Sequence, residues 1–181
     1  AGCTPTQMAW LFSSLFRVTT SAKKKQEFRN QIDQLIKNLT NNKEIFDYEV
    51  YFSEVFHEKG GFDIVIANPP YVSYGLRGVQ KMSEEEKNFL KRAFSDSAEY
   101  KISLYAIFMD KAIQLSGSQG IQTLIVPDSF LMGRYFSKIR NLILRKNNIL
   151  ELLLLPYGVF DATVGFSVVY LFQRIASPNT A

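Results

Sequence analysis

The segment at residues 62–67 constrains the fold of this chain more than any other feature of the sequence. It reads Phe-Asp-Ile-Val-Ile-Ala, a short and mostly apolar run that follows two glycines at 60–61 and ends just before two prolines at 69–70. Glycine and proline interrupt regular structure, and an apolar run of this length is typical of a strand in a parallel sheet. The sequence therefore predicts a buried parallel strand that ends at Asn68.

Helical patterns surround this strand. Ser83 and Glu86 have the spacing of a capping box, which predicts the start of a helix that buries Phe89, Leu90, Ala93 and Phe94. Apolar residues recur at helical spacing in four other segments, residues 5–20, 22–40, 104–115 and 134–146. We expect Gly117 and Gly120 to end the third of these helices.

Strands are predicted between the later helices. Short apolar runs mark residues 121–126, 149–155 and 164–173, and an aromatic-rich connector spans residues 45–56. Strands that are separated by helices imply an open, mostly parallel α/β sheet. The last two strands lie too close together for a crossover helix, so we expect them to pair antiparallel, directly or with the last strand inserted beside another.

Composition limits the kinds of site that this chain can hold. Cys3 is the only cysteine and His57 the only histidine, which excludes an internal disulfide and a structural zinc site and fits a reducing cytoplasmic compartment. No stretch approaches the roughly 20 apolar residues that span a bilayer, so no membrane partner is expected. The formal charge of +4 is compatible with nucleic acid but does not by itself indicate it.

The turn after residues 62–67 carries groups with a definite chemistry. Pro69 and Pro70 lack N–H groups and have a fixed φ, so the turn is stiff and the Pro69 carbonyl is free to accept an external hydrogen bond. The side-chain oxygen of Asn68 is a second acceptor. Two convergent acceptors match an exocyclic NH2 group, and the ring of Tyr71 offers a flat face on which a planar base can stack.

Such a pair of acceptors suits methyl transfer to an aromatic amine. The amine is a poor nucleophile because its lone pair is delocalised into the ring, and holding both N–H bonds favours a pyramidal nitrogen that can attack a sulfonium methyl in line. The hydrogen bonds strengthen as charge develops on nitrogen, which stabilises the transition state specifically. This chemistry requires no metal and no covalent intermediate.

The whole string from Gly61 to Val72 closely resembles the catalytic motif of the amino-methyltransferases. Residues 46–50 and 52–56 are similar to the approach to that motif in adenine-specific enzymes of type II restriction-modification systems, including those that fuse nuclease and methylase. The likeness continues in the family's order through three further segments, residues 104–108, 120–131 and 158–160. The resemblance implies a partial Rossmann-like methyltransferase sheet, mostly parallel with an antiparallel last strand, preceded by N-terminal helices.

The same resemblance implies an activity and a set of site residues. It implies transfer of a methyl group from S-adenosylmethionine to adenine N6 in DNA, within a restriction-modification system. Asn68, Pro69, Pro70 and Tyr71 take the catalytic positions, and Phe160 takes the position of an aromatic residue that holds the base against Tyr71. The implied partner is double-stranded DNA with a flipped adenine.

Part of the family pattern is missing from the sequence. A glycine-rich loop after a strand normally holds S-adenosylmethionine, whereas Gly117 to Gly120 follow a predicted helix. We therefore expect residues 1–181 to be a fragment of one catalytic domain, with a helical segment at 1–44 and a catalytic α/β half at 45–181. A missing N-terminal half and a recognition domain would be its partners, and the chain alone would be inactive.

The missing half has a consequence for the predicted strand at residues 62–67. Without the cofactor-binding strand beside it, this strand becomes a sheet edge with unpaired backbone groups. We expect the N-terminal helices to cover the edge, or a second copy of the chain to pair with it.

Two other functions fit parts of the sequence. A methyltransferase acting on a protein glutamine amide resembles the same motif, but its next strand usually ends in a glutamate, whereas residues 121–126 continue into Pro127 and Asp128. A non-catalytic nucleic-acid-binding module would show a concentrated basic face and would not need the Asn68 turn. Adenine methylation is the function that the whole pattern favours.

Overall fold

The computed structural model describes residues 21–39, 46–74, 82–99, 102–159 and 165–176. The chain divides into two compact units, Ala1–Gly60 and Gly61–Ala181, and each is described by itself. The helix expected at residues 5–20 lies outside the described residues. The proposed division into segments 1–44 and 45–181 stays a prediction.

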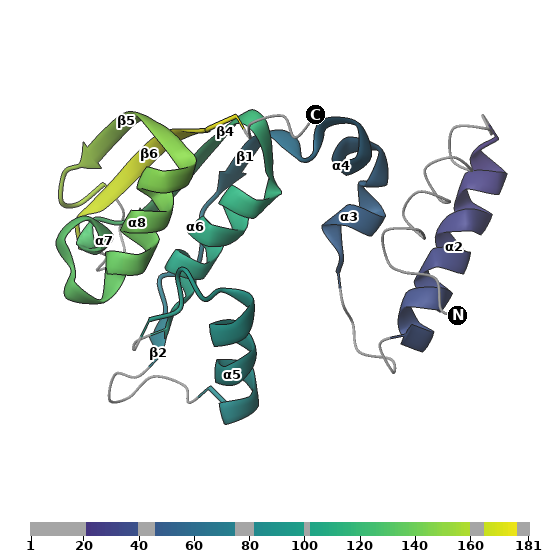
Figure 1. Ribbon diagram of the computed structural model, residues 1–181, viewed down its shortest axis with the longest axis horizontal. Coiled ribbons are helices and arrows are strands. Elements are labelled where there is room, and N and C mark those ends of the chain that lie inside the picture. Colours follow the sequence, from purple (N-terminus) through teal and green to yellow (C-terminus); the bar gives the residue numbers. More distant parts are fainter. Residues whose placement is uncertain (1–20, 40–45, 75–81, 100–101, 160–164, 177–181) are drawn as a thin grey trace. The chain divides into compact units, whose positions relative to one another are not determined.

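The first unit is helical in its described part. It contains α2 (Ala22–Leu39), α3 (Tyr48–Tyr51) and α4 (Ser53–Lys59), so the helix predicted over residues 22–40 is confirmed (Figure 1). The expected connector at residues 45–56 is wrong, because most of it is helical. Asp47 explains why α3 begins where it does, since its side chain accepts hydrogen bonds from the backbone N–H groups of Glu49 and Val50.

The second unit contains a four-stranded sheet in the order β1-β4-β6-β5 (Figure 1). Its strands are β1 (Phe62–Ala67), β4 (Ser116–Pro127), β5 (Asn147–Leu155) and β6 (Ser167–Arg174). β1 pairs parallel with β4, while β6 lies between β4 and β5 and is antiparallel to both. Three strands therefore run in one direction and the last runs against them, which confirms both the α/β class and the inserted last strand.

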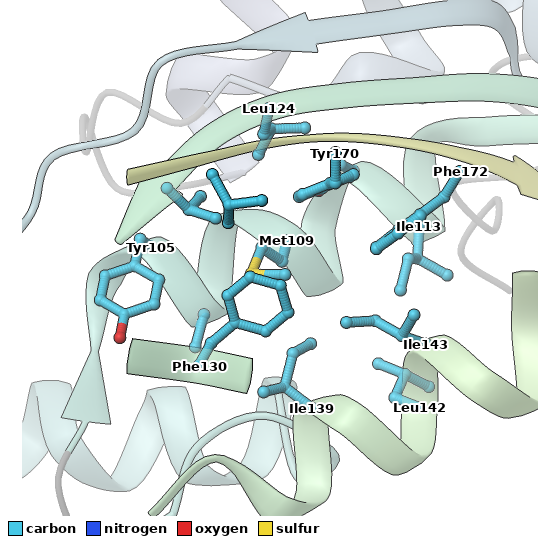
Figure 2. Packing of buried hydrophobic residues seen from close by; sticks show 14 residues of the cluster. Tyr105, Met109, Ile113, Leu124, Phe130, Ile139, Leu142, Ile143, Tyr170 and Phe172 are labelled. Atoms are coloured by element: carbon cyan, nitrogen blue, oxygen red, sulfur yellow. The ribbon is translucent and has the colours of Figure 1, made fainter. Parts of the chain in front are cut away.

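Helices of the second unit pack on one face of this sheet. They are α6 (Leu104–Leu115), α7 (Ser129–Met132), the 3-10 helix η1 (Arg134–Phe136) and α8 (Ser137–Lys146), and α6 contacts β4 while α8 contacts β5 and α6. Figure 2 shows Met109 and Phe130 between the sheet residue Leu124 and Ile139 of α8. Tyr170 stacks on Phe172 in the same core, with ring centroids 4.0 Å apart. This core supports the strand ends that carry the candidate site.

A smaller part of the second unit lies beside this core. It contains α5 (Glu84–Ala93) and a two-stranded antiparallel sheet of β2 (Ser73–Tyr74) and β3 (Ile102–Ser103). The predicted capping box is confirmed, because Ser83 and Glu86 exchange backbone and side-chain hydrogen bonds. The expected burial is only partly correct. Leu90 and Phe94 pack against Ala98, Ile102 and Ile107, whereas Phe89 and Ala93 are exposed because they face away from this cluster.

The expected helix stop at Gly117 and Gly120 is wrong. α6 ends at Leu115, and both glycines lie within β4, which begins five residues earlier than predicted. Gly120, together with Gly61, allows close approach between strands. A Cβ atom on Gly120 would lie 2.7 Å from the carbonyl oxygen of Phe62, and one on Gly61 would lie 2.6 Å from the backbone nitrogen of Gly117. Glycine therefore lets β1 and β4 start side by side.

β1 is an edge of the sheet among the described strands, as predicted. Its expected burial on both faces is wrong in the described part of the chain. Val65 and Ala67 pack against the core, whereas Ile64 and Ile66, which point to the opposite face, are 61% and 74% exposed. Alternate residues of a strand face opposite sides, so helices on one side bury only every second residue of this apolar run.

Two adjacent glycines give a matched stability test of the approach between β1 and β4. Gly61 has a φ of +149° and no room for a Cβ, so Gly61→Ala should lower the free energy of unfolding by about 3 kcal/mol. Gly60 has a φ of +69° and no atom within 4 Å of its Cβ position, so Gly60→Ala should cost only about 1 kcal/mol. Urea unfolding measures both values, and equal losses would contradict the close-approach explanation.

Candidate active site

Asn68 to Tyr71 form the turn that leaves the carboxyl end of β1. Asn68 and Pro70 are exposed, Pro69 is buried and Tyr71 is half-buried. The turn therefore starts at the strand end, and the Asn68 side chain is accessible to a ligand. That Asn68 and the Pro69 carbonyl converge on one bound group stays a prediction.

A cleft of about 310 Å³ lies beside Tyr71. Aromatic rings and serine hydroxyls make up most of its wall, and none of its described lining residues carries a charge. Its lining residues are Tyr71, Ser73, Ser103, Tyr105, Pro127, Ser129, Tyr135 and Phe136. Pro127 is the last residue of β4, so the cleft joins the carboxyl ends of two parallel strands, the usual place for a ligand in an open α/β sheet. A neutral aromatic cleft of this kind suits a planar, uncharged ring.

Backbone pairing fixes the chain that follows Tyr71. The backbone N–H of Leu104 donates to the carbonyl oxygen of Val72 at 2.9 Å, and Ser73 pairs with Ser103 in the small sheet. Leu104 is the first residue of α6, so these bonds tie the turn to a helix of the main core. The position of Tyr71 is thus set from both sides, by β1 before it and by β2 after it.

Tyr105 forms the inner wall of the cleft. Its hydroxyl shares a hydrogen bond of 3.0 Å with the Ser129 hydroxyl, and its ring meets Tyr71 edge-to-face with centroids 6.4 Å apart. Burial raises the pKa of Tyr105 above its ordinary value, and the nearby hydroxyls of Ser129 and Ser103 lower it by less. Tyr105 is therefore a neutral phenol over the physiological pH range.

The outer wall comes from α7 and η1, and Arg140 holds this wall in place. Its guanidinium Nη1 donates to the carbonyl oxygens of Phe130 and Gly133, each at 2.8 Å. The N–H of Gly133 also donates to the carbonyl of Ser129 at 2.7 Å. These bonds satisfy the carbonyl groups at the end of α7. They stabilise this helix, which is too short to form many hydrogen bonds of its own.

Several of these residues were not predicted from the sequence. Of the predicted catalytic residues, Tyr71 lines the cleft, whereas Asn68, Pro69 and Pro70 are not among its lining residues. Tyr105 and Ser129 lie in segments that resemble family motifs, but no site role was predicted for them or for Phe136. Their signal was weak, although Ser129 follows a strand end, where ligand-binding residues gather. Phe160, predicted to stack on the base, lies outside the described residues.

The described residues do not fit S-adenosylmethionine by themselves. Gly117 and Gly120 lie near the start of β4, at the opposite end of the strand from the cleft. No glycine-rich loop follows any strand in the described ranges. Within those ranges there is also no group of three acidic, histidine or cysteine side chains that could hold a metal ion.

None of the helices in the described parts of the chain has the length and apolar character needed to cross a membrane.

Comparison with known proteins places this geometry in a family context. The family described as Eco57I restriction-modification methylase matches residues 6–160. RM.MjaORFECS2P of Methanocaldococcus jannaschii, named as a type II restriction enzyme and methyltransferase, is 27% identical over 172 residues. That match covers 94% of this chain and 13% of the relative, so this chain spans about an eighth of that protein's length.

Two solved structures resemble the chain at low identity. One is a class I S-adenosylmethionine-dependent methyltransferase from Listeria monocytogenes, with a TM-score of 0.49 and 16% identity, over 67% of this chain and 35% of that one. The other is a DrdV–DNA complex, with a TM-score of 0.44 and 18% identity, over 62% of this chain and 13% of that one.

The outer wall of the cleft can be tested through Arg140. Arg140→Ala removes a charged donor from two carbonyls, so the free energy of unfolding should fall by about 2 kcal/mol. Arg145→Ala is the control on the same helix, because Arg145 is exposed and its ion pair with Asp96 is long, at 3.4 Å. That control should cost less than about 1 kcal/mol. Equal losses in chemical denaturation would show that Arg140 does not hold the wall.

Proposed function

Because the chain belongs to the Eco57I restriction-modification methylase family, we propose that it is the acceptor-binding half of a DNA methyltransferase that modifies adenine at N6. The methyl donor would be S-adenosylmethionine, and the parent protein would act in a restriction-modification system on double-stranded DNA with a flipped adenine. The chain spans only 13% of the relative from Methanocaldococcus jannaschii, so the parent would be much longer.

One observation carries this proposal. The Asn68 turn begins at the carboxyl end of β1, with Asn68 exposed, and its Tyr71 lines a neutral aromatic cleft at the same edge of the sheet. The combination supports a site for a nucleobase more strongly than either feature does alone.

The turn would act by holding an amino group. The Asn68 side-chain oxygen and the Pro69 carbonyl oxygen each accept one N–H bond of the adenine amino group, which leaves the nitrogen lone pair free on the remaining side. Because Pro69 and Pro70 make the turn stiff, these acceptors need little rearrangement as positive charge develops on nitrogen. The ring of Tyr71 stacks on the base, and Phe160 is proposed to hold it from the other side.

Binding of the methyl donor is assigned to the missing part of the parent. When bound there, S-adenosylmethionine supplies an electrophilic methyl group. The side of β1 that pairs with no described strand supports this assignment, because a further strand can pair with it there. The loop after that strand would then lie beside the carboxyl ends of β1 and β4. The chain alone would then hold the acceptor side of the reaction and lack the donor side.

Asn68 provides the test of the catalytic assignment. In the parent protein, Asn68→Ala should lower the rate of adenine methylation about a hundredfold, since an oriented hydrogen bond of this kind contributes on the order of 3 kcal/mol in the transition state. DNA binding, measured by fluorescence anisotropy, should change little. Asn88→Ala is the control, because Asn88 is exposed on α5, away from the turn. Wild-type turnover of Asn68→Ala would show that the assigned role is wrong.

The division of labour predicts the behaviour of the isolated chain. Titration calorimetry with S-adenosylmethionine should show no binding in the micromolar range, because no strand in the described ranges is followed by a glycine-rich loop that would hold the donor, and methylation assays should show no product. A positioned donor supplies much of the acceleration in such reactions. One-to-one binding at micromolar concentration would mean that the donor site is complete within this chain.

A further inference from the structure

Tyr105 lies where three parts of the site meet. It is the second residue of α6, it is only 3% exposed, and it contacts the turn that follows β1 and the segment that follows β4. A buried tyrosine with a polar hydroxyl costs more to fold than phenylalanine unless the hydroxyl is satisfied. The Ser129 hydroxyl satisfies the hydroxyl of Tyr105.

The hydroxyl of Tyr105 connects to α7 rather than to the open cleft. It shares its hydrogen bond with Ser129, the first residue of α7. The neighbouring Ser103 hydroxyl is buried and has no hydrogen-bond partner among the described residues. The internal link at the inner wall is therefore the hydrogen bond between Tyr105 and Ser129.

The ring of Tyr105 connects that link to Tyr71. It stacks on Phe136 with centroids 5.4 Å apart and an angle of 27° between the ring planes, which fixes its own orientation. It then meets Tyr71 edge-to-face, at 6.4 Å and 71°. Tyr71 itself is half-buried. An edge-to-face contact restrains the rotation of its ring, because the positive edge of one ring is attracted to the negative face of the other.

We propose that Tyr105 is a positioning residue, which holds the Tyr71 ring at the angle needed to stack on the acceptor base. Ser129 and Phe136 hold Tyr105 in turn, so the segment after β4 controls the turn after β1. This inference rests on the proposed function, because it assumes that Tyr71 contacts the base.

The test uses four variants of the parent protein. Tyr105→Phe and Ser129→Ala each remove one partner of the same hydrogen bond. The double variant, which combines these two changes, loses no further hydrogen bond between these residues. Tyr105→Leu removes the ring as well. Tyr170→Phe is the matched control, because Tyr170 is a buried tyrosine of the same core and stacks on Phe172, away from the cleft.

Each single loss of the hydrogen bond should lower kcat about fivefold, the effect of one ordinary hydrogen bond. The double variant should match the single variants, because both changes break one link. Tyr105→Leu should lower kcat further, about fiftyfold, with the KM for S-adenosylmethionine unchanged. With 2-aminopurine in place of the target adenine, it should also raise the fluorescence of the complex, since the base loses its stacking on Tyr71. Tyr170→Phe should behave as wild type in both assays.

Three outcomes would overturn the inference. They are additive losses in the double variant, an equal loss in Tyr170→Phe, or wild-type kcat and fluorescence in Tyr105→Leu. The two conservative variants keep the test decisive if Tyr105→Leu does not fold. Failure of the proposed function is distinguishable, because then the wild-type parent would not methylate DNA at all.

Discussion

The parallel pairing of β1 with β4 is the constraint on which the rest of the site depends. The two strands run in register from Ile64 opposite Ile121 to Ala67 opposite Leu124, so their carboxyl ends lie at the same end of the sheet. The turn after β1 and the short helix after β4 therefore meet at one place. Glycine at position 61 allows the strands to begin in contact, and the core beneath them, built from α6 and α8, keeps both ends fixed.

Rigidity at this end of the sheet comes from several small restraints rather than from one strong bond. Two prolines stiffen the turn, backbone pairing of Val72 with Leu104 fixes its exit, and Arg140 holds the facing wall. Among the described residues, the lining of the cleft between them carries rings and hydroxyls but no charged side chain. A preorganised, neutral site of this kind suits a reaction in which a neutral amino group becomes positively charged only in the transition state, since fixed acceptors then stabilise the charge without rearranging.

Sequence reasoning predicted the parts of this structure that depend on local patterns. The strand at residues 62–67, the capping box at Ser83 and the inserted last strand were all predicted, because strand length, turn chemistry and loop length determine them. It failed where tertiary contacts decide the outcome. Gly120 would end a helix by local rules but serves strand approach here, and Ile66 is exposed because the described helices of the second unit pack against the other face of β1. Tyr105 was missed as a site residue, since its role depends on neighbours 34 residues before it and 24 after it.

We propose that the site at the carboxyl ends of β1 and β4 binds adenine for methylation at its amino group. The most direct measurement is mass spectrometry of nucleosides from plasmid DNA that has been incubated with the parent protein and S-adenosylmethionine. We expect N6-methyl-2′-deoxyadenosine in the wild-type digest and its loss when Asn68 is replaced. Methylated cytosine without methylated adenine, or a methylated protein glutamine with unmodified DNA, would contradict this proposal.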